Sequence, residues 1–516
     1  MKTTHKFIVL LTALCFNLCF AQLIETKLIP SDGQSGDMFG YSVASDGDFL
    51  VVGSPNAPYP YNHYGAVYVY EKTGGLWEQK TRLAASDSAS LAQFGCSVSI
   101  QGNFILIGAY GDDENGSYSG AAYLFSYNQI SGQWTEHTKL LASDGAVADQ
   151  FGYSVSLFGD YAIVGAPFDH VISAETGSAY IFKWNDTVWV EQAKLVASNG
   201  VGTSPKFGIS TSIYGDYAII GAYSDEGLGT HPGAAYIFYF DGEDWIQQAK
   251  LNASDPELNH LFGHSVSLYE DYAVVGSSSA LTSAGGSAFI FHRDGIIWTE
   301  EAMVQGSSSF THSDFGLSVS LDGNYLVIGA PEDDTNGDHS GCAYIFRRDG
   351  TNWTEQHRLL ASDGNEDDKM GWSVFIEDDQ VVAGAFGQEA GGLYCGAVYV
   401  YNGFVTDLNE SKYSSVEDFH LEQNYPNPFN PSTKINFQIA EFGFVTLKVY
   451  DVLGNEVAKL INNELASGEY EVEFSGHSDE GQNLSSGVYF YQLSIRGPEI
   501  NSGQVMIQTK KMILLK

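Results

Sequence analysis

Basic side chains are scarce in this sequence. Its 516 residues include 24 lysines and arginines against 63 aspartates and glutamates, which gives a formal net charge of −39. A surface this negative repels phosphate backbones, so we expect no nucleic-acid partner. Cation binding and plain solubility are the two properties that such a charge favours.

Long apolar runs are almost absent as well. The run from Phe7 to Phe20 stands alone, and it is shorter than the roughly 20 residues that a membrane-spanning helix needs. Two lysines precede it and the small residues Cys19 and Ala21 end it, which is the pattern of a secretory signal peptide. We predict a signal peptide over residues 1–21, cleavage after Ala21 and no transmembrane span in the mature chain.

Cysteine is nearly missing from the remainder of the chain. Only Cys96, Cys342 and Cys395 follow the leader, and this odd number is not a disulfide framework. Cys342 and Cys395 occupy similar places in neighbouring repeats, so one bridge between them stays open. The alternative is that all three are small buried hydrophobic residues.

Sequence signatures of catalysis are also lacking. The chain contains no G-x-S-x-G, H-E-x-x-H or C-x-x-C motif and no phosphate-binding loop of the Walker type. We therefore expect no enzyme. Carboxylate pairs assembled from distant parts of the chain remain an open route to glycoside hydrolysis.

What the sequence does contain is a repeat. The pattern Phe-Gly-x-Ser-Val recurs with a spacing of 53 to 57 residues, which makes seven units. Five copies are strict and two are relaxed. Their first residues are Phe39, Phe94, Phe151, Phe207 (relaxed), Phe262, Phe315 and Met370 (relaxed).

Each unit carries four strand-like segments. In the third unit these are the alternating segment after Phe151, the apolar run Tyr161–Pro167, the segment Gly177–Phe182 and a segment that starts at Trp189. A four-stranded sheet of this size must cover both faces with its neighbours, and radial stacking of such sheets gives a propeller. We predict an all-β chain with a seven-bladed β-propeller over residues 23–402.

The ends of the array predict how the ring closes. The seventh unit stops after its third segment, Ala397–Tyr401, and no Trp-containing segment follows it. The missing strand lies at the mature N-terminus, where Lys27-Leu28 matches Lys139-Leu140 of an inner repeat. The first strand should therefore complete the last blade and cover its open edge.

These repeats resemble the FG-GAP repeats of integrin α-subunit propellers and of bacterial exported proteins. The antiparallel order of the strands places the loops between strands two and three, and between blades, at one end of the propeller. Those loops are long and vary in sequence, so we expect one variable face, which engages a glycan or a protein ligand.

Two loops of the variable face are acidic and are candidates for calcium, which prefers six to eight oxygen ligands. The D-x-D-x-D-G cage of integrin blades is absent, so solvated acidic loops are the alternative. The candidate ligands are Asp112, Asp113 and Glu114 in the second blade and Glu332, Asp333, Asp334 and Asp338 in the sixth.

Two other recurrent features are interpreted as structural. The Ser-Asp pairs at Asp32, Asp87, Asp144, Asp255 and Asp363 are expected to cap their own turns. The tryptophans at 77, 134, 189, 245, 298 and 353 recur in every outer strand, which favours packing over sugar stacking.

A separate module follows a polar linker over residues 403–420. We predict a small Ig-like β-sandwich over residues 421–516. Its strands are expected at 434–439, 445–451, 469–474, 487–495 and 503–510. A proline-rich segment opens it: Asn424, Tyr425, Pro426, Asn427, Pro428, Phe429, Asn430 and Pro431.

This module resembles the type A C-terminal sorting domain of the type IX secretion system of Bacteroidota. The proline-rich segment, the Ser486–Phe490 motif with Gly487, and the basic end at Lys510 and Lys511 carry the resemblance. It implies recognition by the type IX machinery and then release or attachment to surface lipopolysaccharide. We predict a secreted or cell-surface adhesion protein without a cofactor, apart from calcium. A secreted polysaccharide hydrolase or lyase and a purely structural envelope component are the alternatives.

Overall fold

The computed structural model describes residues 23–57, 64–87, 90–170, 176–185, 187–198, 204–225, 233–254, 261–278, 285–308, 312–389, 394–404, 420–421, 424, 426–439, 443–451, 456–465, 468–476, 484–496 and 506–515. All regular elements among these residues are β-strands. The chain divides into two compact units, Met1–Thr406 and Asp407–Lys516. The predicted signal peptide and most of the predicted linker lie outside the described residues.

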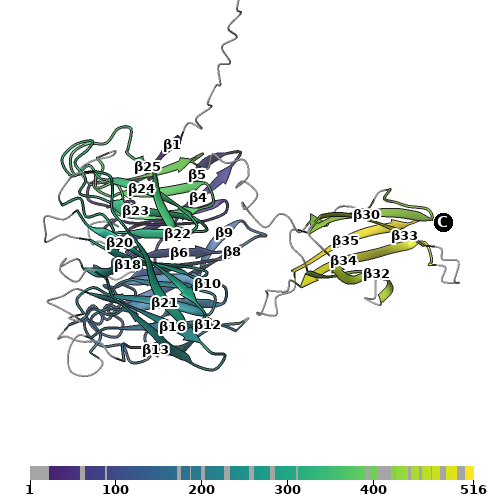
Figure 1. Cartoon of the computed structure of the whole chain (residues 1–516), viewed down its shortest axis with the longest axis horizontal. Coiled ribbons are helices and arrows are strands. Elements are labelled where there is room, and N and C mark those ends of the chain that lie inside the picture. Colours follow the sequence, from purple (N-terminus) through teal and green to yellow (C-terminus); the bar gives the residue numbers. More distant parts are fainter. Residues whose placement is uncertain are drawn as a thin grey trace, which may run out of the picture. The chain divides into compact units, whose positions relative to one another are not determined.

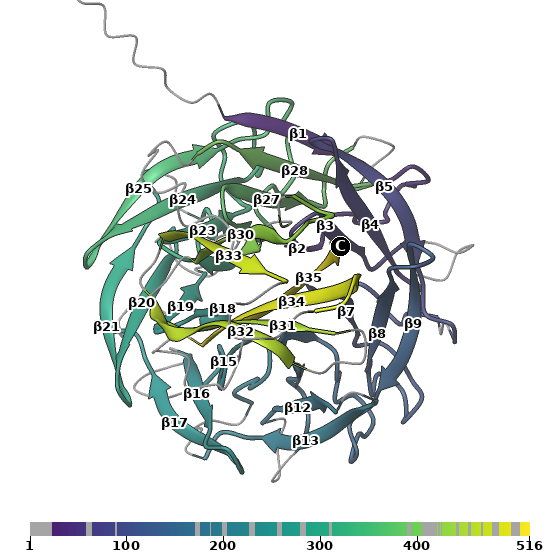
Figure 2. The same cartoon turned by 90° about the vertical axis from the view of Figure 1, so that its right-hand side faces the viewer.

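The first unit contains seven four-stranded antiparallel sheets, the blades, arranged about one axis (Figure 2). The innermost strands are β2 (Ser42–Asp46), β6 (Val98–Gln101), β10 (Ser154–Phe158), β14 (Thr211–Tyr214), β18 (Phe262–Tyr269), β22 (Val319–Asp322) and β26 (Ser373–Glu377). The second strands are β3 (Phe49–Ser54), β7 (Phe104–Ala109), β11 (Tyr161–Ala166), β15 (Tyr217–Ala222), β19 (Tyr272–Ser277), β23 (Tyr325–Ala330) and β27 (Gln380–Ala385).

The third and fourth strands complete each blade towards the rim. The third strands are β4 (Ala66–Thr73), β8 (Ala121–Asn128), β12 (Ser178–Trp184), β16 (Ala234–Phe240), β20 (Ser287–Asp294), β24 (Cys342–Asp349) and β28 (Ala397–Asn402). The fourth strands are β5 (Leu76–Leu83), β9 (Gln133–Leu140), β13 (Trp189–Leu195), β17 (Trp245–Leu251), β21 (Ile297–Val304), β25 (Asn352–Leu359) and β1 (Ile24–Leu28). The predicted seven-bladed propeller is confirmed.

Ring closure follows the predicted interlock. β1, at the rim in Figure 2, pairs antiparallel with β28 over the whole of its length, from Ile24 opposite Asn402 to Leu28 opposite Val398. The last blade is therefore built from both ends of the unit, which leaves its outer edge no more open than that of the other blades.

Backbone contact at glycine joins each blade to the next. At the junction of the third and fourth blades, a Cβ on Gly165 would lie 2.0 Å from the carbonyl oxygen of Gly208. Next to it, Gly177 forms a parallel bridge with Phe207. The same two contacts recur at all seven junctions, including Gly384 with Gly40 and Gly396 with Phe39 where the ring closes. Only glycine permits this approach.

Aromatic side chains fill the space around these backbone contacts. Phe151, the first residue of its repeat, is fully buried and meets Tyr180 edge-on at 5.3 Å between ring centroids. Trp134, Trp189 and Trp245 are buried in the outer strands, as packing predicts. Cys96, Cys342 and Cys395 are buried and none of them is in a disulfide, so the bridge that was left open between the last two is not formed.

The second unit consists of two antiparallel sheets around one core (Figure 1). One sheet contains β29 (His420–Leu421), β30 (Ser432–Ile439) and β33 (Gly468–Ser475), and the other β32 (Glu456–Leu465), β31 (Gly443–Tyr450), β34 (Gly487–Arg496) and β35 (Met506–Leu514). The Ig-like topology stays a prediction.

Strand β32 was not predicted from the sequence. Its register against β31 shifts twice, between Leu447 and Lys448 and between Val449 and Tyr450. Such bulges offset the alternation of apolar and polar residues by which a half-buried strand is recognised.

We predict that Gly165→Ala destabilises the propeller by about 3 kcal/mol, because the added Cβ must push two blades apart. Gly159→Ala provides the control. Gly159 has a φ of +55° but open space around its Cβ position, so only the backbone strain of about 1 kcal/mol is expected there. Urea unfolding of both variants measures the difference, and equal destabilisation would contradict the assigned contact.

Candidate functional site

Six aromatic side chains gather where the innermost strands begin and the second strands end, at the variable face. Tyr41, Tyr153 and Trp372 directly precede β2, β10 and β26. Tyr110, Tyr223 and Phe386 directly follow β7, β15 and β27. All six are half-buried. We name this group the axial aromatic cluster.

Ring contacts of cluster members cross three blade junctions. Tyr41 of the first blade lies 5.6 Å from Trp372 and 6.0 Å from Phe386 of the seventh, measured between ring centroids. Tyr110 and Tyr153, from the second and third blades, are 5.3 Å apart. His264 of the fifth blade lies 5.7 Å from Tyr223.

The tyrosines of the cluster influence one another electrostatically across blades. Burial, followed by the nearby Tyr153 and Tyr110, raises the pKa of Tyr41, although Tyr153 lies two blades away. Burial and the neighbouring Cys96 and Tyr223 raise the pKa of Tyr153 to about 12. No charged side chain of the described residues contributes to the pKa shifts of Tyr41, Tyr110 or Tyr153.

Three of the four phenol groups of the cluster remain available to a ligand. The hydroxyls of Tyr41, Tyr110 and Tyr153 form no hydrogen bond with any described residue. Half-buried rings with free hydroxyl tips present both an apolar face and a polar group.

Sequence reasoning did not find this cluster. Its members occupy the variable position of Phe-Gly-x-Ser and the position after Gly-Ala in the second strand. A comparison of these two positions across the seven repeats would have shown the enrichment in aromatic residues. The ring contacts between distant repeats were not visible in any single repeat.

A second, recurrent group of side chains ties neighbouring blades together near the rim. In the second blade the Tyr123 hydroxyl donates to Asp87 at 2.7 Å and to Asp112 at 2.8 Å. Lys139 binds the same two carboxylates at 2.6 and 3.0 Å. The third blade repeats this arrangement with Tyr180, Lys194, Asp144 and Asp169. We call this arrangement the blade staple.

The staple adds partners in the next blade to the predicted role of the Ser-Asp pairs as local caps. Asp87 follows β5 of the first blade, yet its carboxylate binds side chains of the second. Ser86 likewise donates to Glu136 of the second blade at 2.8 Å. Periodic recurrence marks these residues as structural but does not reveal that their partners lie one repeat further on. Asp255 lies outside the described residues.

In the second blade, the predicted metal ligands are largely engaged in the staple. Asp112 is 2% exposed and bound to Tyr123 and Lys139. Glu114 lies 2.7 Å from the Lys139 ammonium, while Asp113 is exposed to solvent. The lysine thus occupies the position that a cation would take between Asp112 and Glu114.

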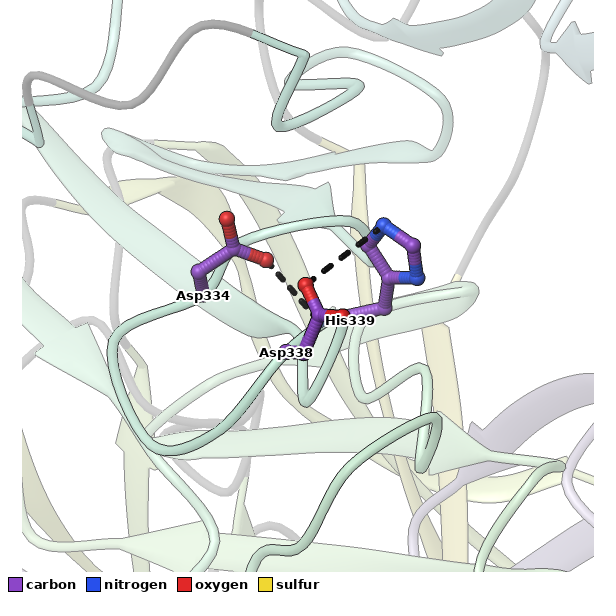
Figure 3. Close-up of side chains that lie close together, drawn as sticks. All are labelled: Asp334, Asp338 and His339. Carbon is purple, nitrogen blue, oxygen red and sulfur yellow. Dashed lines mark hydrogen bonds and ion pairs between the residues drawn. The ribbon is translucent and has the colours of Figure 1, made fainter.

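In the sixth blade the predicted ligands separate into two groups. Asp333 is buried and paired with Arg358, as in a staple. Glu332 binds Lys369 at 2.9 Å. Glu332 also lies 3.5 Å from the His339 imidazole. Asp334 and Asp338 gather around the same histidine, and one potential ligand atom from each of these two residues and His339 lies within 4.8 Å of the others (Figure 3).

This donor set fits calcium poorly. Calcium takes oxygen ligands, whereas His339 offers an imidazole nitrogen. One imidazole with two carboxylates suits a borderline metal such as zinc or manganese better. Calcium binding therefore stays a prediction. Of the seven predicted ligands, Asp334 and Asp338 remain the best candidates.

The variable face also has a hollow of about 520 Å³ beside the third blade. Its charged lining comprises Asp144, Asp149, Asp169, His170 and Lys194. Two of the three carboxylates are already bound to the lysine, since Asp144 and Asp169 lie 2.6 and 2.7 Å from its ammonium. This hollow offers no free pair of carboxylates.

The predicted sorting residues fall into two classes. Asn424 and Phe429 are buried, and the Asn424 side chain donates to Thr433 at 2.9 Å. The remaining described residues of the set reach the surface at least in part: Pro426, Asn427, Pro428, Asn430, Pro431, Gly487, Lys510 and Lys511. Tyr425 lies outside the described residues.

Comparison with known proteins agrees with this architecture. A family model described as FG-GAP repeat matches seven times, at residues 24–70, 77–125, 134–182, 189–238, 245–291, 298–346 and 353–401. A model described as secretion system C-terminal sorting domain matches residues 423–508. No curated protein matches the chain.

Among solved structures, the chain is similar to the crystal structure of Sqt1 from Saccharomyces cerevisiae. The identity is 11%, the alignment covers 78% of this chain and 94% of that chain, and the TM-score is 0.40. Among the described residues, none forms a helix long and apolar enough to cross a membrane.

A buried carboxyl on this face makes stability depend on pH. Asp368 is 1% exposed, and its Oδ1 has no hydrogen-bond partner among the described residues. Burial raises the pKa of Asp368 to about 6, whereas the pKa of an aspartate in an unfolded chain is about 3.9. Between these values the folded protein holds a proton that the unfolded chain has lost, so stability falls as the pH rises.

We predict that Asp368→Asn stabilises the propeller more at neutral pH than near pH 4, because the amide removes a buried charge that exists only at the higher pH. Thermal unfolding at both pH values measures this. An equal change in Tm at the two pH values would contradict the assignment.

For the sixth blade we predict that zinc or manganese raises the Tm more than calcium does, because of the imidazole donor. His339→Gln should abolish the shift. The loop of the second blade has Tyr118 in the place of His339, so Tyr118→Gln is the matched control and should leave the shift unchanged. A calcium shift that survives His339→Gln would contradict the donor set.

Proposed function

Because the chain belongs to the FG-GAP repeat family and ends in a type IX secretion sorting domain, we propose that it is an exported binding protein that holds an uncharged glycan at its axial aromatic cluster. The sorting domain directs the chain to the medium or to the cell surface. After export, removal of this domain with release, or attachment to surface lipopolysaccharide, completes the proposed route.

The axial aromatic cluster is the observation that carries the proposal. Aromatic rings offer flat apolar faces to the C–H faces of sugars, and tyrosine hydroxyls hydrogen-bond to sugar hydroxyls. The rings of Tyr41, Trp372 and Phe386 lie within 6.0 Å of one another, measured between centroids. Together with the free hydroxyls of Tyr110 and Tyr153, they combine stacking surface with polar groups in a small area.

Charge favours a neutral glycan over an acidic one. No lysine or arginine contributes to the pKa shifts of Tyr41, Tyr110 or Tyr153, and the chain as a whole carries a formal charge of −39. A uronate or sulfated sugar would meet repulsion without a compensating ion pair. A protein ligand is the alternative, since Tyr and Trp are also frequent anchors of protein interfaces.

The state of the acidic side chains supports binding without catalysis. A glycosidase needs one carboxyl as acid and a second as base or nucleophile. Asp144 and Asp169 in the hollow of the third blade are both paired with Lys194 and hydrogen-bonded by Tyr180. A secreted hydrolase or lyase remains the rival, and the experiment below distinguishes the two.

We predict that the mature chain binds neutral oligosaccharides on a glycan array and that Tyr41→Ala and Trp372→Ala each weaken binding about tenfold, as expected for central anchors of an interface. Trp353→Ala, in the outer strand β25, is the control and should keep the affinity.

Three results would contradict the proposal. The first is an array that gives no signal or a signal restricted to acidic glycans. The second is an affinity that Trp353→Ala lowers as much as Trp372→Ala does. The third is the release of reducing ends from the bound oligosaccharides, which would identify the chain as a hydrolase.

A further inference from the structure

The last two strands of the sorting domain have one buried and one exposed face. Tyr489 and Met512 face the core, where they are 6% and 0% exposed. Their neighbours Val488 and Phe490 on β34 are 36% and 37% exposed. Lys511 on β35 is exposed and pairs with Phe490 in the register of the two strands. The outer face of this sheet therefore presents apolar side chains beside a lysine.

The proline-rich segment extends the same sheet, although it lies about 80 residues earlier in the sequence. The Phe429 amide donates to the Ile513 carbonyl, and the Leu515 amide donates to the Phe429 carbonyl, both at 2.9 Å. Asn427 donates through its side chain to the Lys511 carbonyl at 3.3 Å. The segment thus runs along the end of β35 as an additional short strand.

Alternation then decides where the side chains of this segment lie. Phe429 is 1% exposed and joins the core with Met512 and Leu514. Pro428 and Asn430, its two neighbours, are exposed, as alternation in an extended strand requires. They flank the sheet on the side of Lys511 and partly exposed Ile513.

Other residues of the proline-rich segment, the Ser486–Phe490 motif and the basic end have an evident structural role. The Asn424 side chain holds the proline-rich segment to Thr433 at 2.9 Å and to the Pro426 carbonyl at 3.1 Å, and the Asn424 amide donates to the Tyr491 hydroxyl at 2.8 Å. The core explains Phe429, Tyr489 and Met512. The core does not account for Pro428, Asn430, Val488 and Phe490, which are exposed in the same motifs.

We propose that the export apparatus recognises these exposed residues as one surface, which we name the sorting surface: Pro428, Asn430, Val488, Phe490, Lys511 and Ile513. The recognition element is thus not the linear C-terminal segment alone but a patch that exists only in the folded domain. This proposal depends on the sorting-domain assignment and not on the glycan proposed for the propeller.

Charge indicates the chemistry of the partner. Lys511 is the one charged residue of the sorting surface, and it stands in a chain with 63 acidic and only 24 basic residues, so a positive charge here is an unusual feature of this protein. A partner that presents apolar side chains around at least one carboxylate is complementary to it. We therefore assign the sorting surface to an acidic, apolar protein surface of the type IX machinery.

The test expresses the full chain in a bacterium with a type IX system and compares the propeller recovered from the medium and cell surface with that retained in the periplasm. We predict that Lys511→Glu lowers the exported fraction about tenfold, the change expected when an interface anchor is lost. Phe490→Ser should act in the same direction. Lys459→Glu is the matched control, since Lys459 is an exposed lysine on β32, at the opposite edge of the same sheet.

Folding is measured separately by the protease resistance of the sorting domain in each purified full-length variant. Normal export of folded Lys511→Glu and Phe490→Ser would overturn the proposal, as would an equal loss of export with Lys459→Glu. If Phe490→Ser unfolds the domain, Lys511→Glu decides alone, because an exposed charge reversal leaves the core intact. Glycan binding by retained protein would show that an export defect is independent of the proposed function.

Discussion

The contact between neighbouring backbones at each blade junction is the constraint on which the rest of the structure depends. Gly165 lies so close to the Gly208 carbonyl that no side chain fits between them, and Gly384 and Gly40 repeat this contact where the ring closes. Because every junction is equally tight, the innermost strands converge on one axis. The residues that flank these glycines are then brought together, and the axial aromatic cluster forms from them.

Much of the fold could be predicted from the sequence because the repeat is periodic. The spacing of the Phe-Gly pairs gave the number of blades, and the match of Lys27-Leu28 to Lys139-Leu140 gave the closing strand. Partners in the next repeat could not be predicted, since every repeat shows the same residues. Asp87 therefore looked like a local cap, and only the structure places it on Tyr123 and Lys139. The irregular strand β32 was missed because its bulges interrupt the alternation.

The candidate site could be predicted only in part, for a related reason. Acidic residues are easily noticed in a sequence, but whether they are free depends on cations from other strands. Asp112 and Asp333 proved to be paired with Lys139 and Arg358. The aromatic cluster shows the opposite behaviour, since Tyr41, Trp372 and Phe386 are unremarkable in their own repeats and become a group only through ring closure. Side chains that recur in most blades, such as the staple residues, hold the ring together. Side chains that occur in only some blades, such as the axial aromatic residues, give the variable face its particular chemistry.

The central claim is that ring closure creates a ligand site at the axis, and hydroxyl-radical footprinting of the mature chain with and without a mixture of neutral oligosaccharides tests it most directly. Mass spectrometry reports the oxidation of each aromatic side chain. The account predicts that the sugars protect Tyr41, Tyr110, Tyr153 and Trp372 while Trp353 at the rim is oxidised equally in both samples. Protection at the rim instead, or oxidation of the axial residues that the sugars leave unchanged, would contradict it.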